Sequence, residues 1–129
     1  MMEAHWRPEG FTVPHAMTYP FRWLWDSCFH SIIWLALGDA DRAVAELEFT
    51  LSVQDDDGFV PHLHYVSAPD HHASFWGRSS VSTISQPPIA GHAVAMLDPF
   101  RLAGLTSVTC KRAASVWCAR WAQSRSIRP

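Results

Sequence analysis

The stretch Tyr19-Pro20-Phe21-Arg22-Trp23-Leu24-Trp25-Asp26-Ser27 stands at the start of a predicted helix and carries more information than any other part of the chain. Two tryptophans and a carboxylate lie close together in it. Indole faces stack on the apolar faces of pyranose rings, and a nearby carboxylate accepts hydrogen bonds from hydroxyl groups, so the stretch suits a sugar ligand. Aromatic residues at helical spacing are also ordinary core residues, so on this stretch alone core packing and sugar binding are both open.

The residues that follow predict a helix from Asp26 to Leu37. Asp26 or Ser27 is the expected cap, and Gly38 is the expected stop. Apolar residues cover most of the helix surface, so we expect it to be largely buried. They are Cys28, Phe29, Ile32, Ile33, Trp34, Leu35 and Leu37.

A second helix is predicted from a cap at Asp39-Ala40-Asp41 to about Gln54, with one apolar stripe and one polar side. A third is predicted to start at Ser85-Gln86-Pro87-Pro88, because proline fits the first turn of a helix, and to continue to Leu97. A buried helix, an amphipathic helix and another apolar helix are the repeating pattern of an α/α hairpin array. The sequence therefore predicts an all-α protein with about three helices and long loops.

The segments between these helices are predicted to be irregular. Asp55-Asp56-Asp57-Gly58 is read as a solvated turn, since no acid closes a calcium loop at the required distance. Phe59 to Val66 is predicted to be extended and Pro69 to Arg78 to be a loop. His62, His64, His71 and His72 could approach a metal ion, but no further ligand completes a shell, so no metal and no cofactor is assigned.

Composition limits the class of protein. The chain has 129 residues, 48% of them apolar, and a net charge of −2, which indicates one folded domain without a basic field for nucleic acid. No long apolar run predicts a membrane span, and the first ten residues lack the apolar stretch of a signal peptide, so we expect a cytoplasmic protein. The three cysteines, Cys28, Cys110 and Cys118, have no zinc-like spacing and are predicted to be free thiols.

Charge divides the chain near residue 98. Residues 1–97 contain four arginines and eleven acids, whereas residues 98–129 contain six basic residues and one acid. The second segment also has no clear apolar period. It is either a basic tail that binds a partner or a stretch that does not naturally continue the preceding sequence, as after a change of reading frame; we favour the second, because Trp117, Cys118 and Trp121 are unusual in a solvated arm.

With these residues assembled, residues 6–97 resemble the N-terminal part of the catalytic domain of glycoside hydrolases of the mannosylglycerate and glucosylglycerate hydrolase type. These are relatives of processing α-glucosidase and of the trehalase-like six-hairpin α/α toroids. Four blocks carry the resemblance: Trp6 to Pro14, Tyr19 to Phe29, Gln54 to His62, and Ser82 to His92. The W-x-W-D block followed by the S-Q-P-P block is the most specific part.

The resemblance implies inverting hydrolysis of an α-glycosidic bond in a small carbohydrate. It implies substrate-binding roles for Tyr19, Trp23, Trp25, Asp26 and Gln86 and no catalytic residue among residues 1–97, because the general acid and base belong to later hairpins. We therefore expect residues 1–97 to be part of a catalytic domain, truncated and inactive alone. The alternative is a noncatalytic carbohydrate-binding or interaction module that uses the same aromatic residues. The sequence does not specify the sugar or an oligomeric state.

Overall fold

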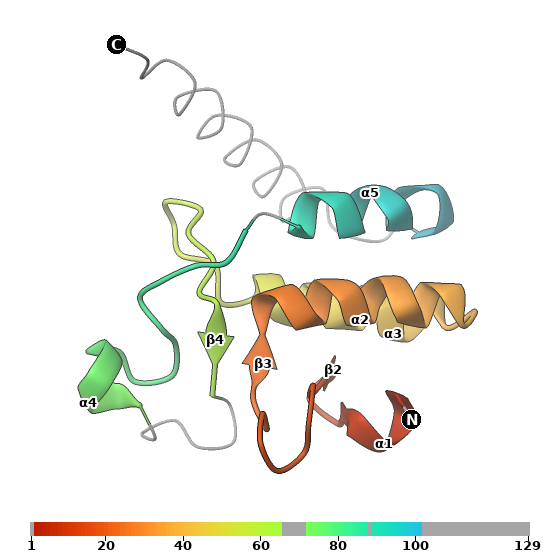
Figure 1. Ribbon diagram of the computed structural model, residues 1–129. Coiled ribbons are helices and arrows are strands. Elements are labelled where there is room, and N and C mark those ends of the chain that lie inside the picture. Colours follow the sequence, from red (N-terminus) through yellow and green to blue (C-terminus); the bar gives the residue numbers. More distant parts are fainter. Residues whose placement is uncertain (1, 66–71, 88, 102–129) are drawn as a thin grey trace.

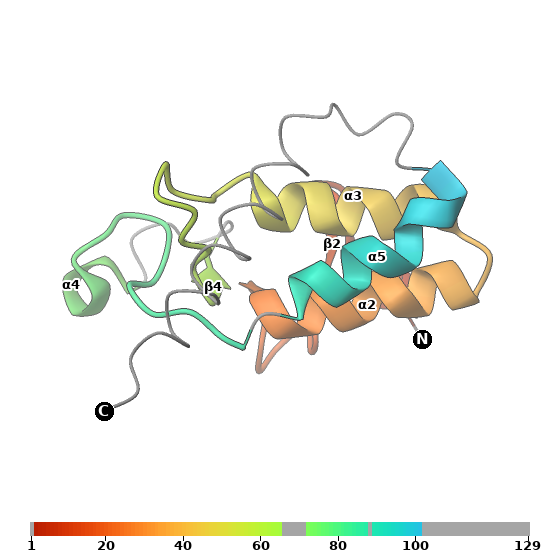
Figure 2. The ribbon, with the colours of Figure 1, turned by 90° about the horizontal axis from the view of Figure 1, so that it is seen from above.

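The structure is a computed structural model that describes residues 2–65, 72–87 and 89–101, with side chains up to Leu97. Two long helices lie side by side, α2 (Leu24–Ala36) and α3 (Ala40–Leu51), and α5 (Ala90–Arg101) lies across both (Figures 1 and 2). The shorter helices are α1 (Met2–His5) and α4 (Ala73–Trp76). Among the described residues, no helix combines the length and apolar character needed to cross a membrane.

Two small antiparallel sheets correct the all-α prediction. In one, β1 (Trp6–Arg7) pairs with β2 (Phe11–Thr12) around a turn in which Gly10 has a φ of 101°. In the other, β3 (Arg22–Trp23) pairs with β4 (Leu63–His64). Strands of two residues are too short to show the alternation that identifies a strand in a sequence.

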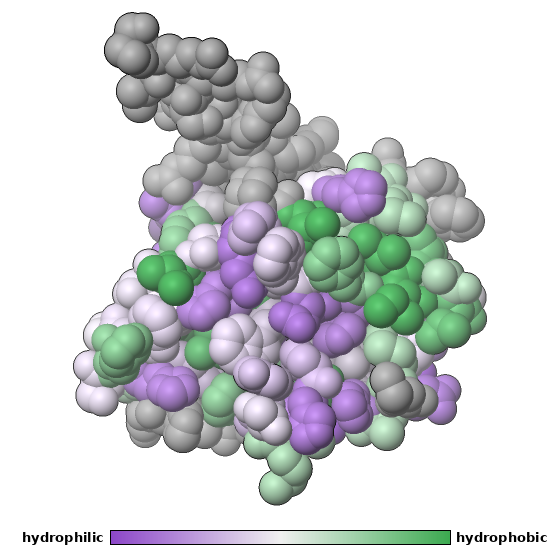
Figure 3. Space-filling model, viewed as in Figure 1, coloured by the Kyte–Doolittle hydropathy of each residue, from purple (hydrophilic) through white to green (hydrophobic). Residues whose placement is uncertain are grey.

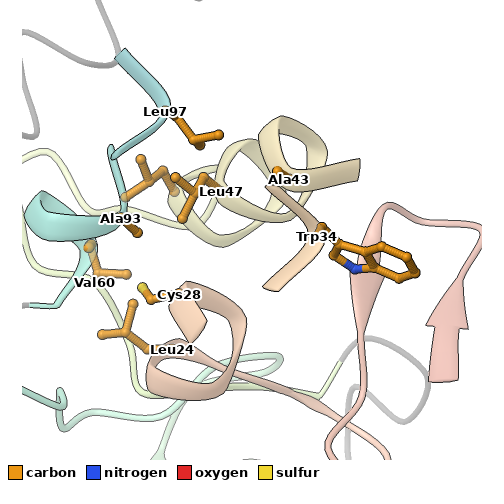
Figure 4. Close-up of a cluster of buried hydrophobic side chains, with 10 residues drawn as sticks. Leu24, Cys28, Trp34, Ala43, Leu47, Val60, Ala93 and Leu97 are labelled. Atoms are coloured by element: carbon orange, nitrogen blue, oxygen red, sulfur yellow. The ribbon is translucent and has the colours of Figure 1, made fainter. Parts of the chain in front are cut away.

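The main core lies where the three long helices meet (Figure 4). Their apolar faces pack together with Val60, which precedes β4. The buried residues are Leu24, Cys28, Trp34, Ala43, Leu47, Leu51, Val60, Ala90, Ala93 and Leu97. Cys28 is a free thiol, as predicted, and the other two cysteines lie outside the described residues. A second cluster of Phe21, Leu63 and Tyr65 supports the β3–β4 sheet.

Several predicted boundaries need correction. The first long helix begins at Leu24, with Trp23 at the cap position and no side-chain cap bond, so the expected cap at Asp26 or Ser27 is wrong. The cap of α3 is confirmed, because Asp39 Oδ1 accepts a hydrogen bond of 3.0 Å from the Arg42 amide. That helix ends at Leu51 rather than near Gln54.

The third long helix starts at Ala90, so the predicted start at Ser85–Pro88 is too early, and the chain ahead of it is bonded to the segment before β4. The His62 amide donates to the Ile84 carbonyl at 2.9 Å. The predicted loop from Pro69 to Arg78 contains the short α4, which ends at Gly77, and its first residues lie outside the described part. The extended conformation predicted for Phe59 to Val66 is confirmed by β4, and Val66 lies outside the described part. The C-terminal segment from residue 98 was predicted to be irregular, but residues 98–101 belong to α5, and the rest of that segment lies outside the described part.

One face of α2 is apolar and exposed, contrary to the expectation of a largely buried helix. Trp25, Phe29 and Ile33 are 41%, 46% and 41% exposed, and Leu37 at its C-terminal end is 64% exposed. These residues follow one another every four positions and form a continuous stripe, here called the α2 stripe, and apolar residues gather over α2 in the space-filling view (Figure 3). A stripe of this kind is typical of a helix face that packs against another element.

Candidate functional site

The N-terminus of α2 is assembled from three distant parts of the chain. The Leu24 amide donates to the His62 carbonyl at 2.8 Å, and the Trp25 amide donates to Oε1 of Gln86 at 2.8 Å. The first amides of a helix have no partner within the helix, and the Trp23 side chain offers no acceptor. Tertiary contacts therefore replace the missing cap and fix where the helix begins.

A pocket of about 210 Å³ opens beside this helix terminus, lined by Pro14, Tyr19, Trp23 and Asp26. The rings of Tyr19 and Trp23 meet edge to face, with centroids 5.8 Å apart. Nε1 of Trp23 is buried and has no hydrogen-bond partner within the described protein. The pocket thus combines two aromatic walls with one carboxylate.

Trp23 is supported from behind by a buried histidine. The His62 ring meets Trp23 and Trp76 edge to face, with centroids 5.5 Å and 5.4 Å away. Its Nδ1 lies 2.6 Å from Oγ of Ser82, and Ser82 in turn accepts a bond from the Leu63 amide at 3.2 Å. Burial is the main cause that lowers the pKa of His62, and the Arg22 charge adds to it, so the imidazole is neutral near pH 7.

The structure brings three of the five predicted site residues together. Tyr19, Trp23 and Asp26 line the pocket. Trp25 is outside the lining and belongs to the α2 stripe, where its ring packs beside Phe29 at a centroid distance of 6.3 Å. The Gln86 side chain reaches the same helix terminus, but its oxygen is bonded to the backbone.

Two neighbours of the pocket were missed from the sequence. Pro14 lines it, but a lone proline carries no chemical signal that would identify it as a wall. His62 was considered only as a metal ligand, whereas its ring packs against the aromatic wall. Its neighbour two residues on, His64, instead stacks on Phe49 at a centroid distance of 5.5 Å. Within the part of the chain that the structure describes, no group of three or more His, Cys, Asp or Glu residues is arranged to hold a metal ion.

This arrangement is suited to a small ring that has apolar faces and a hydroxylated edge. The aromatic rings can pack on the faces, and the carboxylate can accept hydrogen bonds. Only one carboxylate lines the pocket among the described residues. Chemistry that needs two opposed carboxylates therefore requires a group from elsewhere.

Comparison with known proteins matches these features to one family. Residues 19–104 match the family model for the mannosylglycerate hydrolase MGH1-like glycoside hydrolase domain. The chain is 36% identical over 108 residues to mannosylglycerate hydrolase of Thermus thermophilus, covering 71% of this chain and 25% of the relative. It is 32% identical over 98 residues to glucosylglycerate hydrolase of Mycolicibacterium hassiacum, covering 66% of this chain and 21% of the relative.

A solved structure matches as well. It is the crystal structure of GH63 mannosylglycerate hydrolase from Thermus thermophilus in complex with Tris and D-glycerate. The TM-score is 0.65 at 31% sequence identity, over 93% of this chain and 28% of that one. The chain thus spans about a quarter of the length of these relatives.

Proposed function

Because this chain belongs to the mannosylglycerate hydrolase MGH1-like glycoside hydrolase family, we propose that it carries part of the sugar-binding site of a hydrolase acting on α-glycosidic bonds. The observation that carries the proposal is the pocket at the start of α2, where Tyr19, Trp23 and Asp26 meet. The relatives are a mannosylglycerate hydrolase and a glucosylglycerate hydrolase. The proposed substrates are therefore glucosylglycerate, mannosylglycerate or a short α-glucoside.

Each residue has a role that follows from its chemistry. Tyr19 and Trp23 pack on the apolar face of the sugar, and Asp26 accepts hydrogen bonds from its hydroxyl groups. Gln86 has its oxygen on the Trp25 amide, so its amide nitrogen is the atom that reaches a ligand, and Trp25 adds an aromatic edge beyond the pocket.

The proposed reaction is inverting hydrolysis. A general acid protonates the leaving oxygen while a general base activates water on the other face of the sugar, and the two carboxyl groups stand roughly 6.5–9.5 Å apart. We assign Asp26 to hydroxyl binding and neither catalytic role to residues 1–97. The acid and base come from sequence that corresponds to the remaining length of the relatives.

We further propose that residues 1–97 are part of a six-hairpin α/α toroid and that residues 98–129 do not continue it. The α2 stripe supports the first point, since the faces of toroid helices are covered by neighbouring helices and this face is exposed. The second point rests on the change of charge and pattern near residue 98, although α5 extends to Arg101 and the family match runs to residue 104. A coding sequence that resumes the family pattern in another reading frame after codon 98 would support it, and a conserved frame in independent isolates would contradict it.

Binding is the direct test, by isothermal titration calorimetry of the full chain with glucosylglycerate and mannosylglycerate. We expect binding by the wild type and no hydrolysis. D26N removes a charged acceptor worth about 1.5–3 kcal/mol, so its affinity should fall by at least about tenfold. The matched control is E48Q, which neutralises an exposed acid on α3 and should bind as the wild type does.

The outcomes separate the alternatives. A wild type that binds neither sugar, or D26N that binds as well as E48Q, contradicts the proposed site. Binding with turnover contradicts the absence of an acid and base. Binding without turnover is also what a noncatalytic sugar-binding module would show, and the coding sequence beyond codon 98 distinguishes that module from part of a hydrolase.

A further inference from the structure

The segment that leads into one wall of the pocket is deeply buried at Thr12 of β2. Thr12 is 1% exposed, and Val13 after it is 0% exposed. Pro14 comes next and lines the pocket. Because β2 has only two residues, the polar groups of this buried segment need partners outside its own short sheet.

The Thr12 amide is bonded to a buried carboxylate of α3. Oε2 of Glu46 accepts from this amide at 2.8 Å, and the Glu46 side chain is 0% exposed. The other oxygen, Oε1, lies 3.8 Å from Nδ1 of His30 on α2. A bond from an amide to a carboxylate is stronger than one between neutral groups, and burial keeps water from competing for it. Glu46 therefore joins β2 firmly to α3.

The Thr12 side chain is bonded to the other helix of the pair. Nε1 of Trp34 on α2 donates to Oγ1 of Thr12 at 2.9 Å, and the indole points from α2 toward the N-terminal segment (Figure 4). The next residue is held too, because the Val13 amide donates to the carbonyl of His5 in α1 at 3.0 Å. Bonds to three helices thus hold the two residues that precede Pro14.

We infer that Thr12 is a positioning residue of the pocket: Glu46 and Trp34 hold it between α3 and α2, and it sets where Pro14 forms the wall. The proline ring fixes its own φ and restricts the residue before it, so a fixed Thr12 leaves Pro14 little freedom. Glu46 and Trp34 are not among the lining residues and act on the wall through Thr12. Contact of this wall with a sugar rests on the proposed function, whereas the positioning of Pro14 does not.

Hydrogen exchange of the full chain at one constant pH tests the two bonds, with two pairs of variants. E46L removes the acceptor of the Thr12 amide, and E46Q keeps one. Relative to the amides of α5, the Thr12 amide should exchange at least about tenfold faster in E46L than in E46Q. T12V removes the acceptor of the Trp34 indole, and T12S keeps one. The Trp34 indole N–H should exchange about two- to tenfold faster in T12V than in T12S.

The proton and carbon signals of Pro14 test the position of the wall without any sugar. In the wild type they should differ from those of a proline in an unstructured chain, because the ring is fixed beside aromatic walls. In T12V and E46L they should move toward the unstructured values, and in T12S and E46Q they should stay in place. L97A is the control, since Leu97 is buried in the helical core: it should lower overall stability and leave the Pro14 signals unchanged.

Sugar affinity tests the last step, at a temperature where the variants are folded. Glucosylglycerate should bind T12V and E46L at least about threefold more weakly than the wild type, and T12S, E46Q and L97A within about twofold of it. Pro14 signals that move without any change in affinity overturn the contact of this wall with the sugar.

The remaining outcomes decide the positioning itself. Folded T12V and E46L with unchanged Pro14 signals overturn it. If neither variant folds, the wild type decides, because a Thr12 amide that exchanges as fast as exposed amides contradicts its bond to Glu46, and slow exchange supports it. A wild type that binds no sugar counts against the proposed function, and the exchange rates and Pro14 signals still decide the role of Thr12.

Discussion

Gln86 is predicted to stabilise the start of α2. Of two substitutions, Q86M should therefore lower the free energy of unfolding, whereas Q86E should not. Gln86 Oε1 accepts a bond of 2.8 Å from the Trp25 amide, the second residue of the helix. Q86M has a similar size but no acceptor. Q86E keeps an acceptor and adds a negative charge at the positive end of the helix dipole.

The magnitudes follow from helix capping. Loss of a capping acceptor costs about 0.5–2 kcal/mol, and the exposure of this bond lets water replace part of it, so we expect about 0.5–1 kcal/mol for Q86M. A carboxylate at a helix N-terminus contributes about 0.3–1 kcal/mol, so Q86E should match or exceed the wild type in stability. The assay is urea unfolding followed by circular dichroism. The free energies of unfolding are compared between variants whose dependence on urea concentration has the same slope.

Either of two results would refute this reasoning. Q86M as stable as the wild type would mean that the Trp25 amide needs no side-chain acceptor. Q86E as unstable as Q86M would mean that the size and polarity of glutamine matter rather than the acceptor. In the first case a role for Gln86 would have to lie in ligand contact alone.

Three further predictions concern packing, pH and thiol chemistry. L47A should reduce the free energy of unfolding by about 2–5 kcal/mol, because Leu47 is buried among three helices, whereas L37A on the exposed stripe should change it by under about 0.5 kcal/mol in the same urea assay. Hydrogen bonds from Arg78 lower the pKa of Asp55, so this pair contributes stability above the unfolded pKa of Asp55 that is lost as pH falls through the folded value. The contribution of this pair should stay below about 1 kcal/mol. In R78M the urea midpoint should therefore fall less on acidification than it does in the wild type. With the other two cysteines replaced by serine, Cys28 should react with a disulfide reagent near pH 8 only after unfolding, and rapid labelling of the folded chain would contradict its burial.

The helical part of the fold was predictable because it depends on local signals. Apolar residues at helical spacing predicted α2, and Asp39 after Gly38 predicted the start of α3. The strands were not predictable, because β3 and β4 are two residues each and their pairing joins Trp23 to Leu63 across a long separation. The residue that supplies the acceptor for α2, Gln86, is 61 positions from Trp25, so no local pattern could replace the expected cap.

The grouping of the candidate residues around one pocket was predictable to the same degree. Tyr19, Trp23 and Asp26 are close in sequence, so a short extended segment followed by a helix start brings them to one pocket. Trp25 was grouped with them by sequence proximity, but adjacent helical residues point about 100° apart, and its ring lies on the stripe instead. The burial of Arg22 and Glu46 gave no signal, since an arginine and a glutamate in a sequence are ordinarily surface residues.

The most direct test of the pocket is the indole N–H signal of Trp23 in a proton–nitrogen correlation spectrum, assigned by its loss in W23F. Added glucosylglycerate or mannosylglycerate should shift this signal, because the Trp23 ring lines the pocket and a sugar packed against it changes the surroundings of the indole. The same titration of D26N should need a much higher sugar concentration. A Trp23 signal that stays in place while the sugar saturates the protein would contradict the proposed site.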